Sequence, residues 1–165
     1  MSPLRPDLVD CWIFRLPPSG AVEVLLIRRA PGRILPGLWQ CVSGSIEPGE
    51  RVAMAALREV REETSFDAST IEAFFDLDFV NQFHEPSVDA VVTSAVFAVR
   101  VRPGVPARLS HEHDGARWVS LAEAADEVVW PGYREALDRI RDYLLHPRRA
   151  PWFELDLDGG RVVGA

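Results

Sequence analysis

The stretch GSIEPGERVAMAALREVREETSF, Gly44–Phe66, runs from a loop rich in glycine and proline into a predicted helix over residues 51–64. Apolar residues, followed by one threonine, recur along it with the i, i+3, i+4, i+7 spacing of a helix that buries one side. This stripe consists of Ala53, Ala56, Leu57, Val60 and Thr64. The segment therefore predicts a helix that packs against a core.

Three glutamates crowd the end of this helix. Each residue advances about 100° around a helix axis, so Glu59, Glu62 and Glu63 share an arc of roughly 100° beside the apolar stripe. One interpretation is a solvated acidic face with Arg58 and Arg61 as ion-pair partners. Two features favour a bound divalent cation instead. The acids adjoin the buried side, and the helix dipole disfavours negative charge at the C-terminal end.

The spacing of these residues resembles the Nudix box, the signature of the Nudix hydrolase family. The matching positions are Gly44, Glu50, Arg58, Glu59, Val60, Glu62 and Glu63, within a box over residues 44–66. Ser65 stands where the family has glycine. We expect Ser65 to end the helix with a left-handed backbone, at a cost on the order of 1 kcal/mol. The alternative is that the helix ends differently, at Thr64.

The order of elements around the box also fits the family, whose fold is an α+β, Nudix-type α/β/α sandwich with a mixed β-sheet. We expect one domain over residues 1–165, with a central strand at 89–101 because that run is almost continuously apolar or β-branched. The other predicted strands are 7–16, 23–29, 39–46, 71–83 and 116–121. A helix capped by Ser120 and an amphipathic helix over 130–146 follow. Residues 147–165 form a tail with a predicted hairpin that turns at DGG.

The resemblance implies a role for each charged residue of the box. Glu59, Glu62 and Glu63 would hold one or more Mg²⁺ (or Mn²⁺) ions that bridge a substrate diphosphate. A main-chain carbonyl of Ser43 or Gly44 would complete the coordination. Arg58 would orient the glutamates through charge-assisted hydrogen bonds. Glu50 would stabilise the junction between loop and helix.

Many family members add a glutamate from outside the box, as a metal ligand or general base. Glu112, in the segment SHEHDGARW, is the candidate here. An ordinary exposed loop acid is an equally good interpretation of Glu112. The histidines on either side of it, His111 and His113, are expected to be solvated loop residues.

Beyond the box, the run WQCVSGSIEPGE resembles dihydroneopterin triphosphate pyrophosphatases and bacterial dATP-type pyrophosphohydrolases. That resemblance implies a nucleoside triphosphate-like substrate, cut between its α and β phosphates with release of pyrophosphate. ADP-ribose, a dinucleoside polyphosphate or an oxidised dNTP remain alternatives. So does a non-catalytic Nudix-fold module that binds a nucleotide or a protein. Retention of all four box glutamates favours an active enzyme.

Several residues outside the box are candidate substrate contacts. Arg28 and Arg29 end a predicted strand and could meet phosphates, or could be solvated charges. Trp39 and Phe83, with Phe79 and His84, could frame a base or pterin ring, although core packing is the more ordinary role for aromatic side chains.

Composition bounds the other classes of function. The chain has 165 residues, 47% hydrophobic and 26% charged, which is typical of a globular protein. A net charge of −7 argues against non-specific binding to nucleic acid polymers or anionic membranes. Cys11 and Cys41 lack metal-site spacing and predict buried thiols in a reducing compartment. With no recognisable signal peptide or membrane span, we expect a cytoplasmic protein, either a monomer or a homodimer.

Overall fold

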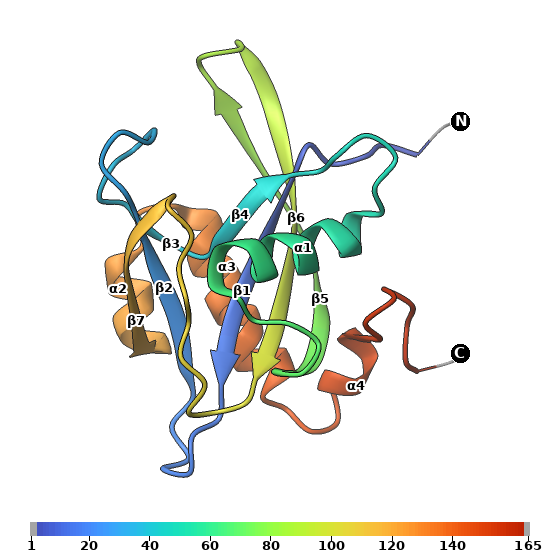
Figure 1. Cartoon of the computed structure of the whole chain (residues 1–165). Helices are drawn as coiled ribbons and strands as arrows, with labels where there is room; N and C mark the ends of the chain where they lie inside the picture. Colours follow the sequence, from blue (N-terminus) through green and yellow to red (C-terminus); the bar gives the residue numbers. More distant parts are fainter. Residues whose placement is uncertain (1–2, 164–165) are drawn as a thin grey trace.

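The computed structural model describes residues 3–163, in which eight strands form one mixed sheet (Figure 1). The strands are Leu8–Arg15 (β1), Glu23–Arg29 (β2), Trp39–Gln40 (β3), Val42–Ser45 (β4), Ile71–Glu85 (β5), Ala90–Val101 (β6), His113–Ser120 (β7) and Glu154–Leu155 (β8). The sheet order is β3-β2-β1-β6-β5-β8, with β4 added to β1 and β7 to β2. Strand β6 therefore lies in the middle of the sheet, as its composition predicts.

Helices cover both faces of this sheet. Helix Val52–Thr64 (α1) lies on one face, and Leu121–Glu127 (α2) and Pro131–Arg139 (α3) lie on the other (Figure 1). A π-helical turn, Ile140–Leu144 (η1), and a short helix, Ala150–Phe153 (α4), follow. Side chains alternate between the faces along a strand, and β1 accordingly divides its residues between two cores. The predicted α/β/α arrangement with a mixed sheet is confirmed.

Strand β1 sits between neighbours of opposite direction. It runs parallel to β6, from Leu8 opposite Ser94 to Phe14 opposite Arg100, and antiparallel to β2 and β4. Its Val9, Cys11 and Ile13 belong to the core beneath α1. Its Trp12 and Phe14 belong to the core beneath α2 and α3. Asp10 points to that second face, and both cysteines are buried as free thiols, as expected.

Two predicted elements are divided in the structure. The predicted strand 39–46 becomes β3 and β4, because β1 and β2 pair with each other only at Phe14–Val24 and Arg15–Glu23 and then separate. The chain therefore adds β3 to β2 and, beyond Cys41, β4 to β1. The predicted helix 130–146 changes to π-helical geometry at Ile140.

Helix α1 ends as the sequence predicts. Ser65 has φ 64° and ψ 11°, the left-handed conformation, and its N–H donates to the carbonyl of Arg61. Phe66 then turns into the core, where it is 1% exposed. The expected capping box at Ser120 and Glu123 is also present at the start of α2.

The C-terminal tail forms a turn that returns along the sheet edge. Strand β8 pairs with β5, and Leu155 forms a bridge with Arg161 across the turn. The N–H of Asp156 donates to the carbonyl of Gly160 over 2.8 Å, so the chain turns at the DGG segment with a single bridge. Over the residues that the structure describes, no helix is long and apolar enough to cross a membrane.

Candidate functional site

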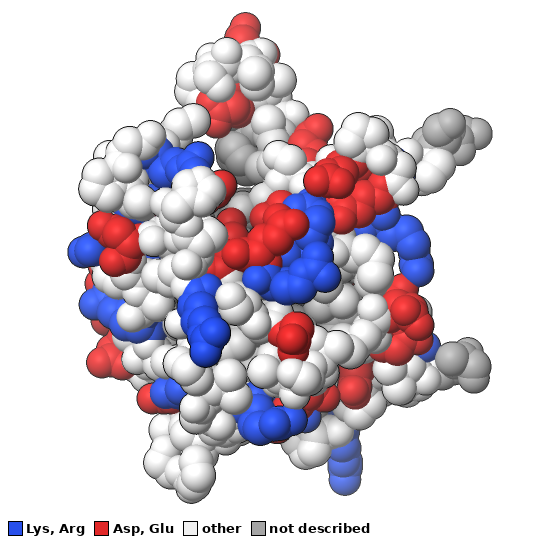
Figure 2. Space-filling view, viewed as in Figure 1, with Lys and Arg blue, Asp and Glu red and all other residues white. Residues whose placement is uncertain are grey.

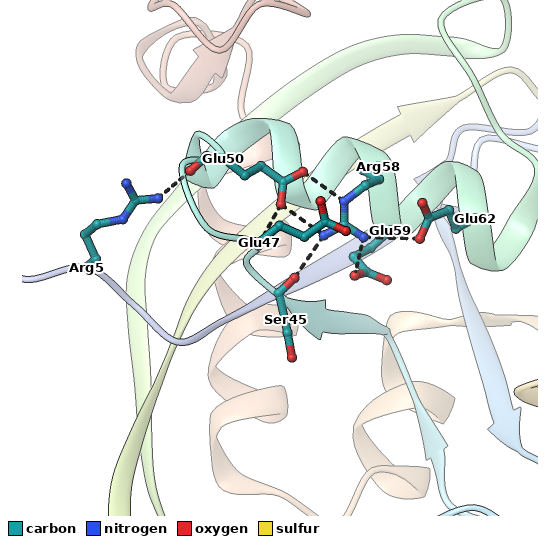
Figure 3. Close-up of polar contacts among 7 residues, drawn as sticks. All are labelled: Arg5, Ser45, Glu47, Glu50, Arg58, Glu59 and Glu62. Atoms are coloured by element: carbon teal, nitrogen blue, oxygen red, sulfur yellow. Dashed lines mark hydrogen bonds and ion pairs between the residues drawn. The ribbon is translucent and has the colours of Figure 1, made fainter.

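Arg58 is the centre of a polar network at the start of the box (Figure 3). Its guanidinium donates two hydrogen bonds to the Glu50 carboxylate, from Nε to Oε1 at 2.8 Å and from Nη2 to Oε2 at 3.0 Å. The same side chain donates to Glu59 at 2.7 Å, to Glu62 at 3.1 Å and to the Ser45 carbonyl at 2.9 Å. These hydrogen bonds hold the pKa of Glu50 below its ordinary value.

The loop between β4 and α1 is held by hydrogen bonds from within the loop and from the N-terminal segment. The N–H of Glu47 donates to the Glu50 carboxylate over 3.0 Å. From the N-terminal segment, the Arg5 guanidinium donates to the main-chain carbonyl of Glu50 (Figure 3). The side chains of Arg58 and Glu50 are only 16% and 15% exposed, so the protein shields this ion pair from most of the solvent. The network fixes the path from β4 into the helix.

Gly44 is required by the position of Glu59. A Cβ atom at residue 44 would lie 2.0 Å from Glu59 Cδ and 2.1 Å from Oε1, far inside contact distance. The Glu59 carboxylate therefore rests directly on the β4 backbone. Burial raises its pKa, and the charges of Glu62 and Glu112 raise it further, while Arg58 lowers it.

Glu63 points inward from the last turn of α1 and is 4% exposed. Its Oε2 atom is among the buried polar atoms that have no hydrogen-bond partner within residues 3–163. Burial raises its pKa to about 9, with a further contribution from the Glu59 and Glu112 carboxylates. Arg29 and the N–H of Ser43 act in the opposite direction. A carboxylate in this position is costly unless a cation joins it.

His113 is buried, so its predicted position as a solvated loop residue is wrong. It is 6% exposed, and its Nε2 lies 4.0 Å from Glu63 Oε2 and 3.4 Å from Gln40 Nε2. Burial lowers its pKa, which keeps the ring neutral near pH 7. Sequence reasoning missed His113 as a neighbour of Glu63 and Gln40 as a neighbour of His113.

The cause is a β-bulge between β2 and β7. Leu25 pairs with Trp118 and Ile27 with Ala116, so regular alternation would place Asp114 opposite Arg29. The register shifts between Arg28 and Arg29, and His113 takes that place instead. A one-residue shift turns a side chain to the other face, and the sequence carries no local signal for it.

Glu112 lies at the border of this site. Its carboxylate is 3.5 Å from Arg33 Nη2 and its side chain is 43% exposed. Its charge raises the pKa of both Glu59 and Glu63, so it lies close enough to the box glutamates to act on them. His111, its other neighbour, is exposed as predicted.

The candidate substrate residues lie in three places. Arg29, on β2, lowers the pKa of Glu63 by its charge and donates from Nε to the Ile34 carbonyl. Arg28, on the opposite sheet face, pairs with Asp114 at 2.8 Å. Trp39 carries two guanidinium groups over its ring, Arg117 at 4.3 Å and Arg28 at 5.5 Å from the ring centroid.

Phe83 and His84 belong to the part of β5 that projects with β6 beyond the rest of the sheet (Figure 1). Phe83 is 39% exposed, and His84 pairs with Asp89 at 3.1 Å. Phe79 lies nearer the core, under the guanidinium of Arg139.

Acidic side chains gather over α1 and the loop before it, around a group of arginines (Figure 2). This donor set fits a divalent cation of the Mg²⁺ or Mn²⁺ kind, because it offers carboxylate oxygens, one of them buried without a partner. Across residues 3–163, however, no three His, Cys, Asp or Glu side chains are already gathered around one point that could hold a metal ion. Arg58 holds Glu59 and Glu62, whereas Glu63 turns inward.

Comparison with known proteins gives a consistent result. The sequence model of the NUDIX domain matches residues 7–140. An octanoyltransferase from Myxococcus xanthus is 38% identical over 119 residues, covering 71% of this chain and 32% of that protein. The mouse asymmetrical bis(5′-nucleosyl)-tetraphosphatase is 34% identical over 131 residues, covering 76% of this chain and 83% of that protein. The Escherichia coli dihydroneopterin triphosphate diphosphatase is 48% identical over 45 residues, 27% of this chain and 28% of that protein.

Solved structures share the fold. The E. coli dihydroneopterin triphosphate pyrophosphohydrolase superposes with a TM-score of 0.69 at 26% identity, covering 82% of this chain and 94% of that one. A Caenorhabditis elegans Ap4A hydrolase complex superposes with a TM-score of 0.71 at 19% identity, covering 83% and 96%. The chain spans about a third of the Myxococcus protein and most of the mouse protein.

Proposed function

We propose that this chain, which belongs to the NUDIX family of hydrolases that act on diphosphate bonds, is a metal-dependent pyrophosphohydrolase. Its substrate is a nucleoside triphosphate-like molecule, a dNTP or dihydroneopterin triphosphate, cut to a monophosphate and pyrophosphate. The observation that carries this proposal is the buried, unpartnered Oε2 of Glu63, whose pKa is raised by the neighbouring, partly buried carboxylate of Glu59.

In this proposal Glu59, Glu62 and Glu63 hold Mg²⁺ or Mn²⁺ together with a main-chain carbonyl of Ser43 or Gly44. A bound divalent cation activates water and offsets the negative charge of phosphoryl oxygens. Arg58 bonds only Oε1 of Glu59 and Oε2 of Glu62, which leaves the second oxygen of each carboxylate to contribute, and Oε2 of Glu63 has no partner in the described residues.

Arg58 acts as a positioning residue and does not touch the substrate. Its double hydrogen bond with Glu50 anchors the guanidinium to the loop, and its remaining N–H groups set the orientation of Glu59 and Glu62. Glu50 therefore serves the site through Arg58 and through the Glu47 N–H.

Glu112 is proposed as a further metal ligand or as the general base. Its carboxylate is partly exposed, as an acid that meets both solvent and substrate should be. Arg29 is the better placed of the two strand-end arginines to meet phosphate near Glu63, because its charge acts on Glu63, whereas Arg28 pairs with Asp114. Its Nε donates to the Ile34 carbonyl, so its terminal N–H groups would meet the phosphate. Trp39 and Phe83 are proposed to contact the base. The guanidinium groups of Arg28 and Arg117 already lie over the Trp39 ring, so the base would contact the part of the ring that they leave uncovered.

A dinucleoside polyphosphate is the second candidate substrate. The observation that favours it is the similarity to the mouse tetraphosphatase, which extends over 83% of that protein. The similarity to the bacterial dihydroneopterin triphosphate enzyme is higher in identity but covers only 45 residues.

The test is a panel of dNTPs, dihydroneopterin triphosphate, ADP-ribose and dinucleoside polyphosphates with Mg²⁺, in which phosphate and pyrophosphate release are scored separately. Glu63→Gln should abolish hydrolysis while the protein stays folded. Glu72→Gln is the matched control, because Glu72 is a surface acid paired with Arg100. Unchanged turnover by Glu63→Gln would contradict the assignment, and a wild-type protein inactive on every substrate would favour a nucleotide- or protein-binding module.

A further inference from the structure

Glu63 lacks the support that the other acids of α1 receive. Arg58 bonds Glu50, Glu59 and Glu62, yet Glu63 Oε2 has no hydrogen-bond partner within residues 3–163. The N–H of Ser43 acts on this carboxylate, but Oε2 itself has no such support, and an oxygen that nothing holds is presented poorly to a ligand. Some group must therefore determine its orientation.

The ring of His113 is the nearest candidate for that role. The bulge between β2 and β7 brings it beneath α1, with Nε2 4.0 Å from Glu63 Oε2. The Gln40 amide lies 3.4 Å from the same nitrogen. Both the imidazole and the carboxylate are almost fully enclosed, with side-chain exposures of 1% and 6%.

The position of the ring proton follows from counting unsatisfied groups. If the Gln40 NH₂ donated to Nε2, the proton would sit on Nδ1, which has no partner in the described residues. A buried N–H would then be unsatisfied next to the unpartnered Glu63 oxygen, and leaving a buried donor without an acceptor is costly. With the proton on Nε2 and the amide rotated, the N–H lies between the Gln40 carbonyl oxygen and Glu63.

The geometry points to His113 as a positioning residue that directs its Nε2–H toward the Glu63 carboxylate, with Gln40 holding the ring from the other side. In this arrangement the Nε2–H fixes the orientation of the Glu63 carboxylate, and Oε2, which accepts no other hydrogen bond in the described residues, keeps a lone pair to face a divalent cation. This inference rests on the proposed function, because it assigns a task to Glu63 as a metal ligand. His113 would act only through Glu63 and would not touch the substrate.

Two substitutions separate this role from simple filling of space. The amide nitrogen of glutamine can occupy the place of Nε2, whereas that of asparagine reaches only the place of Nδ1. We therefore compare His113→Gln with His113→Asn, and use His111→Ala, an exposed site in the same segment, as the control. Circular dichroism and melting of the metal-free proteins verify that each variant folds.

The first measurement is Mn²⁺ binding by calorimetry, without substrate. We expect His113→Asn to weaken Mn²⁺ affinity by roughly 10- to 100-fold, the usual effect of removing a group that orients a metal ligand. His113→Gln should stay close to wild type, and His111→Ala should bind unchanged. In hydrolysis assays kcat should fall for His113→Asn with little change in KM. Equal Mn²⁺ affinities for the Gln and Asn variants would overturn the inference.

The second measurement is the tautomer of His113 by long-range ¹H–¹⁵N NMR of the wild-type protein saturated with Mg²⁺, in which the Glu63 carboxyl is ionised. The signals are assigned by their loss in His113→Gln. A proton on Nε2 supports the inference and a proton on Nδ1 contradicts it. Neither measurement needs turnover, so a protein that binds Mn²⁺ but hydrolyses no substrate would contradict the proposed function alone.

Discussion

Asp10 should make the protein less stable as the pH rises through the weakly acidic range. This residue lies on β1, faces the core beneath α3, and is 4% exposed. Burial raises its pKa from an ordinary value of 3.8 to about 6, although the Ser43 hydroxyl acts against that rise. The folded protein therefore holds the Asp10 proton more tightly than the unfolded chain does.

The sign and the size of the effect follow from linkage. Below about pH 4 both states keep the proton, and Asp10 does not change the free energy of unfolding. Between about pH 4 and 6 the unfolded chain ionises first, so the free energy of unfolding falls. Above about pH 6 the loss is complete, and the difference between the two pKa values corresponds to about 3 kcal/mol.

The substitution Asp10→Asn removes this titration. The amide has nearly the same shape, and its oxygen can still accept from the Ser43 and Ser94 hydroxyls, which act on the Asp10 carboxylate. At pH 8 the variant should be more stable by up to about 3 kcal/mol, or about 6–12 °C in Tm. At pH 4 the two proteins should melt together.

The assay is urea and thermal unfolding of both proteins at pH 4 and 8, with EDTA present. Other carboxyl groups with raised pKa values, above all Glu63, titrate in both proteins and cancel in the difference. Asp126→Asn, at an exposed position, serves as the control. A gap between wild type and Asp10→Asn that is the same at both pH values, or a variant that is less stable at pH 8, would refute the reasoning.

Three further changes test the box. Gly44→Ala should displace the Glu59 carboxylate, cost about 1 kcal/mol in stability and weaken Mn²⁺ binding about tenfold or more; calorimetry showing wild-type affinity would contradict this. Ser65→Gly should raise the free energy of unfolding by about 0.5–1 kcal/mol, because relief of the left-handed strain exceeds the added entropy of the unfolded chain. A drop in Tm would rule that out. Arg58→Lys should lower the free energy of unfolding by about 2 kcal/mol and reduce turnover, since an ammonium cannot bond Glu50 with two parallel N–H groups. Urea unfolding indistinguishable from wild type would show that one donor suffices.

Local patterns were sufficient to predict much of this fold. The stripe on α1 repeats with the helical period, and the structure buries Ala56, Val60 and Thr64 of it. Strand β6 could be recognised as central because a strand flanked on both edges and covered on both faces must be apolar almost throughout. The conformation of Ser65 follows from its place after the last turn of a helix.

Features that depend on pairing between distant segments could not be predicted in this way. The division of 39–46 into β3 and β4 depends on where β1 and β2 separate. The inward position of His113 depends on a register shift against β2. The sequence also could not show that the ring of Trp39 is already covered, because the guanidinium that lies over it belongs to Arg117 on another strand. These are contacts of tertiary structure, and the residues concerned carry no periodic signal.

The balance of charge around α1 explains why a divalent cation suits this site. The carboxylates that face one another here belong to Glu50, Glu59, Glu62, Glu63 and Glu112. Three guanidinium groups oppose them: Arg58 bonds the first three, Arg33 lies beside Glu112, and Arg29 acts on Glu63. With every carboxyl ionised, two negative charges remain. Without a cation, the raised pKa of Glu63 keeps its proton near pH 7, which removes one of them. A divalent cation that displaces this proton would meet the two remaining charges, so its binding should strengthen as the pH rises toward the pKa of Glu63.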